Sequence, residues 1–322
     1  MAQGPESLVD PWRAYQHPLF YQRVGLLNPA DRWDVLTTLR SAEIASPESR
    51  PVWERLLPHF RERLALSPMH AVDELDELAV RAVGHALNRN LHTTAIIAAL
   101  AAGTPIDAVV DVSTSATLRS AVAARGSAIV LPVHARAIEA GVFALSRVMP
   151  TTLVVSQTAG IPDDTTPFED LVGPTDLQVL RAPDNRVLVR CVKAARSGRV
   201  LVLPPEFTSN DHDMVIPYEL AGRQIGVPSA YVELARRLDL PLVPMLFEQR
   251  ADSGYQWILD GPFEPDDLTG GVPTVIGRVF AMVEAVLSED PTEWEGWYMF
   301  DRMIADGERL AMTPAAPPLV TA

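Results

Sequence analysis

Two residues capable of acid–base chemistry stand close together just after a short apolar run. The run covers residues 127–133 and leads into His134, and Glu139 follows five residues later. Imidazole gains and loses a proton near neutral pH, which suits it to general-base catalysis. A carboxylate that accepts from one ring nitrogen fixes the tautomer and leaves the other nitrogen to take a proton. We therefore predict that His134 is a catalytic base and that Glu139 orients it.

The sequence around this pair predicts a strand followed by a helix. Residues 127–133 are mostly apolar, and the run is too short and too rich in β-branched residues for a helix. Such a run, preceded by Gly126, is typical of a strand buried on both faces of a sheet. Residues 135–148 have apolar side chains at the spacing of a helix with one buried face. His134 is thus expected at a strand-to-helix junction, where open α/β sheets hold their ligands.

A purely structural role for the pair is the alternative. His134 would then be a hydrogen-bonded structural histidine, and Glu139 a carboxylate favoured near a helix N-terminus by the helix dipole. The chain has 41 acidic residues and seven histidines among 322 residues, so an acid at this distance from some histidine arises readily by chance. Support for catalysis must come from other parts of the chain.

A second block follows the next apolar run. Residues 200–203 predict a strand, and residues 204–209 after it read Pro-Pro-Glu-Phe-Thr-Ser. Together with the spacing of His134 and Glu139, this order resembles the lysophospholipid acyltransferase superfamily, in particular its lipid A lauroyl/myristoyl acyltransferase branch. The matches to the superfamily's Pro-Glu-Gly-Thr-Arg block are Pro205, Glu206 and Thr208.

This block also departs from the superfamily. Phe207 stands in place of the glycine, and Ser209 in place of the arginine that holds the acceptor phosphate in glycerol-phosphate members. Loss of a guanidinium removes a bidentate phosphate clamp, which argues against a phosphoglyceride acceptor. The resemblance continues through residues 220–235, 240–247 and 291–297, and covers the chain from about residue 115 to residue 303.

The resemblance implies an α/β fold with a central, mostly parallel sheet flanked by helices. We expect an N-terminal helical portion over residues 1–110, a catalytic domain over 111–310 and a disordered tail over 311–322. The implied activity is acyl transfer from an activated thioester or ester to a hydroxyl or amine, with His134 and Glu139 as the catalytic residues. Arg136, Glu206 and Thr208 are expected to contact substrate.

Proline and capping residues predict how the N-terminal portion is divided into helices. We expect three or four helices before the sheet, with starts at residues 28–29, 46–47 and 67–68, where a capping residue precedes a proline. Residues 157–183 are rich in Asp, Thr and Pro and are predicted to be mostly loop. A loop of that length in a compact domain is commonly a wall or lid of a substrate site.

A basic stripe stands out in an acidic protein. The net charge is −14, yet residues 181–199 contain six basic residues and one acid. On a helix, Arg186, Arg190 and Lys193 would share one face, with Val187, Leu188, Cys191 and Val192 turned inward. The stripe is expected either to bind the acyl donor or to be an ordinary solvated face. Candidate donors are a coenzyme A thioester, an acyl carrier protein or an aminoacyl-tRNA, and the acceptor is a small molecule.

Other features restrict the location and the cofactors. No apolar run is long enough to cross a bilayer, and a charge of −14 disfavours anionic membranes, so we expect a cytoplasmic protein without stable membrane association. Cys191 is the single cysteine. His85 and His92 would lie about 10 Å apart along one helix, too far to share a metal ion unless a second element intervenes. We expect no cofactor and no metal.

Two other classes of function stay open. One is a transferase for a small specialised metabolite that uses a carrier-bound or tRNA-bound acyl or aminoacyl group. The other is a non-catalytic scaffold that binds a ligand in front of His134. The sequence lacks the Gly-x-Ser-x-Gly elbow of serine hydrolases and both the P-loop and dinucleotide fingerprints.

Overall fold

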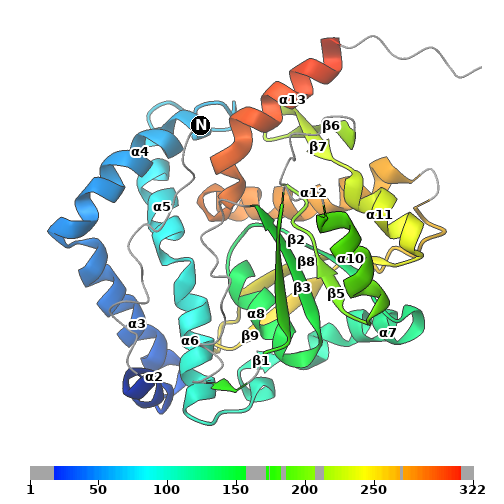
Figure 1. Cartoon of the computed structure of the whole chain (residues 1–322). Helices are drawn as coiled ribbons and strands as arrows, with labels where there is room; N and C mark the ends of the chain where they lie inside the picture. Colours follow the sequence, from blue (N-terminus) through cyan, green and yellow to red (C-terminus); the bar gives the residue numbers. More distant parts are fainter. Residues whose placement is uncertain are drawn as a thin grey trace, which may run out of the picture.

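A seven-stranded sheet forms the centre of the protein (Figure 1). The computed structural model describes residues 18–156, 172–173, 175–182, 186–206, 214–268 and 271–312. The order of strands is β1-β9-β8-β2-β5-β3-β4, and every neighbouring pair is parallel except β8 and β9. The expected α/β class with a mostly parallel sheet is therefore confirmed. The strands are β1 (Val110–Asp111), β2 (Ile129–Pro132), β3 (Thr151–Ser156), β4 (Leu177–Ala182), β5 (Val200–Val202), β8 (Leu242–Gln249) and β9 (Tyr255–Leu259).

Strand β2 is central, and its sequence explains why. Val130 is paired with Val202 of β5 on one side and with Val243 of β8 on the other. Ile129 and Leu131 pack into a core on one face of the sheet, and Val130 packs into a separate core on the other face. The continuous apolar run is therefore needed because both faces of this strand are covered.

Helices cover both faces of the sheet. α4, α5, α10, α11, α12 and α13 contribute to the core that contains Ile129, whereas α6, α7 and α8 contribute to the core that contains Val130. The helices are α2 (Pro18–Gly25), α3 (Pro29–Ile44), α4 (Arg50–Leu64), α5 (Leu75–Asn88), α6 (Asn90–Ala101), α7 (Ala116–Arg125), α8 (Ile138–Val148), α10 (Val187–Arg196), α11 (Ala230–Leu238), α12 (Val272–Glu289) and α13 (Phe300–Met312). Short 3₁₀ turns are η1 (Pro47–Ser49), η2 (Ile106–Ala108), η3 (Val112–Ser115), η5 (Pro291–Glu293) and η6 (Glu295–Met299).

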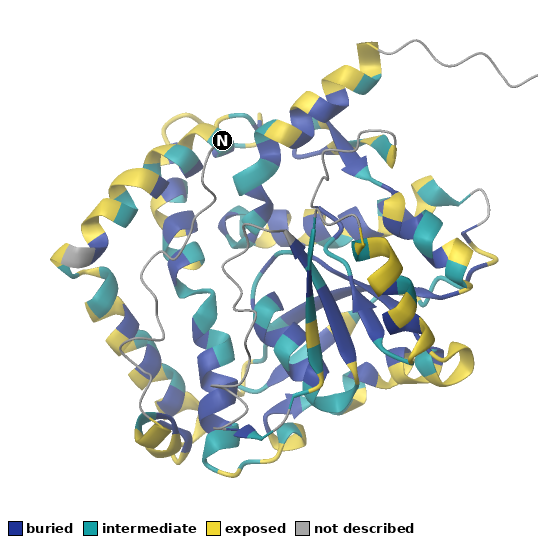
Figure 2. Ribbon diagram, viewed as in Figure 1, coloured by how far each residue is buried: buried dark blue, intermediate teal, exposed yellow. Residues whose placement is uncertain are grey.

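The N-terminal helices stand beside the sheet, at the left of Figure 1. α3 begins after Asn28 as predicted, because the Asn28 side chain accepts a hydrogen bond of 2.9 Å from the amide of Asp31. The outer faces of α3 and α4 are exposed and their inner faces are buried, as Figure 2 shows. Among the described residues, no helix is both long enough and apolar enough to cross a membrane.

The helix start predicted at residues 67–68 is wrong. The Ser67 hydroxyl donates to the carbonyl of Ala221, at 2.9 Å, instead of capping a helix. Ala221 and Gly222 form the turn of an antiparallel hairpin, β6 (Val215–Leu220) and β7 (Arg223–Pro228), that the sequence did not predict. Both have positive φ, and a Cβ on Gly222 would come within 2.5 Å of Pro68. Ser67 and Pro68 therefore dock the hairpin onto the helical portion.

The stretch predicted as loop over residues 157–183 needs a correction. Its last part forms β4, which pairs with β3 along six residues at the edge of the sheet. Residues 157–171, 174 and 183–185 lie outside the described residues. Of the tail predicted over residues 311–322, the first two residues belong to α13, and residues 313–322 also lie outside the described part.

Candidate functional site

His134 lies just beyond the end of β2, where the carboxyl ends of the parallel strands meet. Its side chain is 19% exposed. The backbone amide of His134 donates to Oε1 of Glu206 at 2.8 Å, and Nδ1 lies 2.9 Å from Oε2 of the same carboxylate. Glu206 is completely buried. One carboxylate therefore holds both the backbone and the ring of His134.

The register of the sheet explains this pairing. Val130 of β2 lies opposite Val202 of β5, and His134 and Glu206 each follow four residues after these partners. Two parallel strands end side by side, so side chains that follow them at the same distance come together. A buried carboxylate is tolerated only when it is paired and hydrogen-bonded. His134 provides the ion-pair partner of Glu206 through its ring and a further hydrogen bond through its backbone amide.

The electrostatics of the pair favour the charged ring. Burial acts to lower the pKa of His134, but the charge of Glu206 and its hydrogen bond outweigh burial, with smaller contributions from Glu295 and Glu139, and the pKa is raised. Glu206 is therefore placed to stabilise an imidazolium, as an orienting carboxylate does next to a general base.

Glu139 does not occupy the position that the sequence predicted for it. It lies in the first turn of α8, and its Oε1 is 3.6 Å from Nε of Arg89. Glu139 is the main cause of a raised pKa of Arg89. The chain makes a left-handed turn at Arg136, with φ 57°, before α8 begins, so Glu139 is not on a helix continuous with His134. Glu206 takes the orienting position, and Glu139 adds only a longer-range charge.

Arg136, predicted to contact substrate, is held by carboxylates of the protein. Its Nε lies 3.1 Å from Glu293, and its two terminal nitrogens form ion pairs with Glu248 and Glu289. Its side chain is 17% exposed. The structure therefore shows Arg136 as a link between the loop after β2, the end of β8 and the segment after α12.

The basic stripe lies on α10 and just before it. Arg186, Arg190 and Lys193 are all exposed, and the exposed face of α10 is visible in Figure 2. Leu188 was expected to turn inward, but it is 56% exposed because the buried face of this helix consists of Cys191, Ala194 and Ala195. A role of the stripe in donor binding stays a prediction. Thr208, the last predicted substrate contact, lies outside the described residues.

No protein-family model matches the chain, and no curated protein matches it. The resemblance to the acyltransferase superfamily therefore stays a prediction.

A second group of ionisable side chains lines a cavity of about 540 Å³. Its lining includes apolar residues such as Trp33, Leu91 and Trp294. The ionisable residues of the lining are His85, Arg89, His92, Arg136, Glu248, Glu289, Asp290, Glu293 and Glu295.

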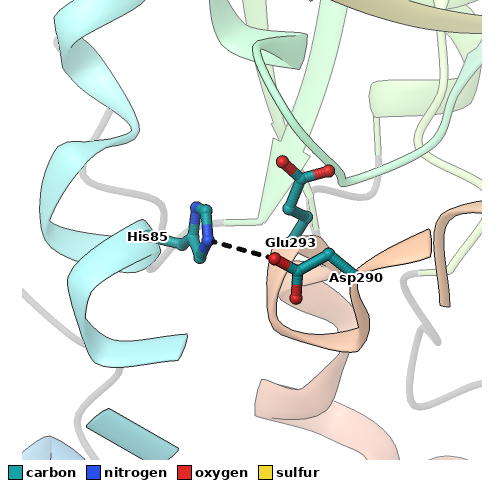
Figure 3. Close-up of side chains that lie close together, drawn as sticks. All are labelled: His85, Asp290 and Glu293. Carbon is teal, nitrogen blue, oxygen red and sulfur yellow. Dashed lines mark ion pairs between the residues drawn. The ribbon is translucent and has the colours of Figure 1, made fainter. Parts of the chain in front are cut away.

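The two cavity histidines have different environments. His92 is stacked on Trp33, with ring centres 4.6 Å apart, and burial lowers its pKa to about 4. It is therefore a neutral packing residue. His85 is 44% exposed, and its Nε2 lies 3.8 Å from Oδ2 of Asp290 (Figure 3). Asp290 lies 205 positions after His85 in the sequence, so no local pattern around His85 predicts this contact.

Proposed function

We propose that the protein is an acyltransferase in which His134 is the general base and Glu206 is the residue that orients it. The observation that carries this proposal is the contact of 2.9 Å between Nδ1 of His134 and a completely buried carboxylate. An imidazole held in this way has one tautomer and one orientation, which general-base catalysis requires. The position of His134 beyond the carboxyl ends of parallel strands, where such sheets bind ligands, supports a functional role.

The reaction follows from this arrangement. Glu206 holds Nδ1, so exchange of a proton with the substrate falls to Nε2. The acceptor's hydroxyl or amine gives its proton to Nε2 as its oxygen or nitrogen bonds to the carbonyl carbon of the acyl donor. The tetrahedral intermediate then expels the donor's thiolate or alkoxide, which takes the proton back from His134. Glu206 stabilises the imidazolium between these steps, and no covalent enzyme intermediate is needed.

A search for the donor tests the proposal. Purified protein would be mixed with coenzyme A thioesters, acyl carrier proteins or aminoacyl-tRNA in the presence of hydroxyl and amine acceptors, and formation of the acylated acceptor would be followed by mass spectrometry. Turnover that is lost in His134→Ala and in His134→Asn, both correctly folded by circular dichroism, is the expected result. Turnover unchanged in both variants would contradict the proposal. Binding of a ligand without turnover of any donor would favour a scaffold.

The α10 stripe favours a donor that carries negative charge. Arg186, just before α10, and Arg190 and Lys193 on α10 are exposed in a protein with a net charge of −14. A carrier protein or tRNA would gain steering and affinity from such a patch, and salt would weaken the effect. Reversing the charges of Arg186 and Arg190 together is expected to raise the apparent KM for the donor and to flatten its dependence on ionic strength. An unchanged salt dependence with every donor would leave the stripe as a solvated face.

We further propose that the protein acts in the cytoplasm without stable membrane association. The support is its net charge of −14, because anionic membrane surfaces repel an acidic protein. Sedimentation with vesicles of phosphatidylserine and phosphatidylcholine at physiological salt checks this proposal. The protein is expected in the supernatant, and firm binding to the vesicles would contradict it.

A further inference from the structure

We propose that His85, Asp290 and Glu293 form a binding site for a divalent transition-metal ion at the wall of the 540 Å³ cavity. One ligand atom from each residue lies within 4.8 Å of the other two. Figure 3 shows the His85 ring directed at Asp290, with Glu293 close to both. The ligand atoms of a tetrahedral zinc ion are roughly 3.4 Å apart, given bonds of about 2.0–2.2 Å. Small side-chain rotations would therefore complete the site.

The ligand set indicates which kind of ion would bind. An imidazole nitrogen combined with two carboxylates suits Zn²⁺, Mn²⁺ or Fe²⁺, whereas Mg²⁺ and Ca²⁺ prefer oxygen ligands alone. Three protein ligands leave at least one coordination position for water or for another molecule, as in catalytic zinc sites. His85, Asp290 and Glu293 all line the cavity, so a further ligand has room to approach from there.

Asp290 is already fixed in an orientation that suits a ligand. Its Oδ1 accepts hydrogen bonds from the backbone amide and the hydroxyl of Thr292, at 2.9 and 2.6 Å, and Oδ2 is the oxygen on the His85 side. The two hydrogen bonds from Thr292 therefore orient the Asp290 carboxylate without a metal.

The neighbouring arginines would not prevent binding. Arg81, the ion-pair partner of Asp290, is 45% exposed and can turn into solvent. Arg136 contacts Glu293 but also pairs with Glu248 and Glu289, so it keeps two carboxylates when Glu293 turns towards a metal. Counted together, the residues that line the cavity include five carboxylates and two arginines. Its charge therefore favours a cation.

A metal here would join distant parts of the chain next to His134. His85 lies in the last turn of α5, Asp290 is the N-cap of η5, and Glu293 is the last residue of η5. The residues after η5 contact the catalytic loop: the Glu295 amide donates to the carbonyl of His134 at 2.8 Å, and Ala135 is bridged to Trp294. The ion would therefore hold the segment that supports His134 against the N-terminal helices.

Calorimetric titration of the full chain, after removal of metals with EDTA, tests the site. We expect one Zn²⁺ or Mn²⁺ to bind per chain, more tightly than Mg²⁺, and Co²⁺ to give a visible absorption spectrum. His85→Ala and Asp290→Asn should each weaken Zn²⁺ binding at least tenfold. Glu289→Gln is the matched control, because this acid lines the same cavity without belonging to the ligand set, and it should change the affinity less than threefold.

Two outcomes would overturn the proposal. One is the absence of Zn²⁺, Mn²⁺ and Fe²⁺ binding to the wild-type chain. The other is binding that His85→Ala leaves unchanged, which would mean that the acidic cavity merely attracts cations. His85→Gln provides a second variant at this half-exposed position, and circular dichroism of both variants separates loss of a ligand from loss of the fold. The proposal is independent of acyl transfer, since the readouts are binding and absorption.

Discussion

His134 and His85 both face a carboxylate, but their surroundings differ. His134 is 19% exposed, and Glu206 is completely buried and contacts both the ring and the backbone amide of this histidine. His85 is 44% exposed and lies 3.8 Å from Asp290, whose oxygens also contact Arg81 and Thr292. Among the residues that the structure describes, the Glu206 carboxylate accepts hydrogen bonds from His134 alone, whereas the Asp290 carboxylate is shared between several partners. Burial and a dedicated carboxylate make His134 an oriented base. The greater exposure of His85 and the shared carboxylate of Asp290 leave a position where a metal can bind.

The largest expected difference between Glu206 and Asp290 is the effect of their substitution on turnover. Glu206→Gln removes the charge that stabilises the imidazolium, and turnover should fall by about 10²- to 10⁴-fold, the usual range for general-base catalysis. Asp290→Asn should leave turnover within a few-fold of wild type when no metal is supplied. Initial rates with the identified donor and acceptor check both variants. Equal losses in the two variants would remove the distinction between the two regions.

The free energy of unfolding should also depend more strongly on Glu206 than on Asp290. Glu206→Ala removes the buried partner of the His134 ring and backbone amide, and breaking a buried pair costs about 3–5 kcal/mol. Asp290→Ala loses a partly exposed ion pair and a cap of η5, together about 1–2 kcal/mol. Urea unfolding followed by tryptophan fluorescence gives both free energies. A cost for Glu206→Ala no larger than that for Asp290→Ala would show that the His134 pair is not effectively buried.

A metal ion should stabilise the protein only through the site formed by His85, Asp290 and Glu293. Zn²⁺ at 100 times its dissociation constant is expected to raise the free energy of unfolding by about 2.7 kcal/mol. His85→Ala, with binding at least tenfold weaker, should reduce this gain to about 1.4 kcal/mol or less, whereas Glu139→Gln should keep the full gain. Thermal melts with and without Zn²⁺ measure the difference. An equal gain in His85→Ala and wild type would place the ion elsewhere.

The smallest expected effect concerns Tyr231, whose hydroxyl lies in the electrostatic field of Glu206. Burial, followed by the charge of Glu206, raises its pKa, and the hydroxyl has no hydrogen-bond partner within the part of the chain that the structure describes. Replacing an unpaired buried hydroxyl by hydrogen is neutral or stabilising. Tyr231→Phe should therefore raise the free energy of unfolding by up to about 1 kcal/mol. A clear loss of stability in urea would reveal a partner for this hydroxyl.

Local patterns were sufficient to predict the framework of the site. The apolar run before His134 forms β2, the periodic apolar residues after it form α8, and Asn28 caps α3. In each case the signal lies within one segment of chain. The β6–β7 hairpin was missed because its strands contain proline and glycine and it lies outside the central sheet.

Contacts between distant segments were not predictable in the same way. Glu206 was selected as a site residue, but its contact with His134 depends on the register of β2 and β5, which no local pattern reveals. Glu139 was the plausible partner because it is near in sequence, and the left-handed turn at Arg136 separates it from the ring. Asp290 and Glu293 meet His85 only because α5 packs against η5.

The most direct test of the account is a pH titration of His134 by long-range ¹H–¹⁵N NMR, with the signal assigned from its loss in His134→Asn. The pKa of His134 is expected above 6.5 because Glu206 stabilises the charged ring, and the neutral ring should carry its proton on Nδ1. A raised pKa in the folded state means that the stabilisation is complete below the unfolded pKa and is lost as pH rises through the folded one. As pH rises from the unfolded to the folded pKa of His134, the free energy of unfolding should therefore decrease. Over the same pH interval the fraction of neutral His134 should increase.

Two variants make this titration decisive. In Glu206→Gln the pKa of His134 should fall clearly below its wild-type value, because burial then acts without the opposing charge. In Glu139→Gln it should fall only slightly, because this carboxylate acts from a distance. A wild-type pKa at or below 6.5, or a larger fall in Glu139→Gln than in Glu206→Gln, would contradict the assignment of Glu206 as the residue that orients His134.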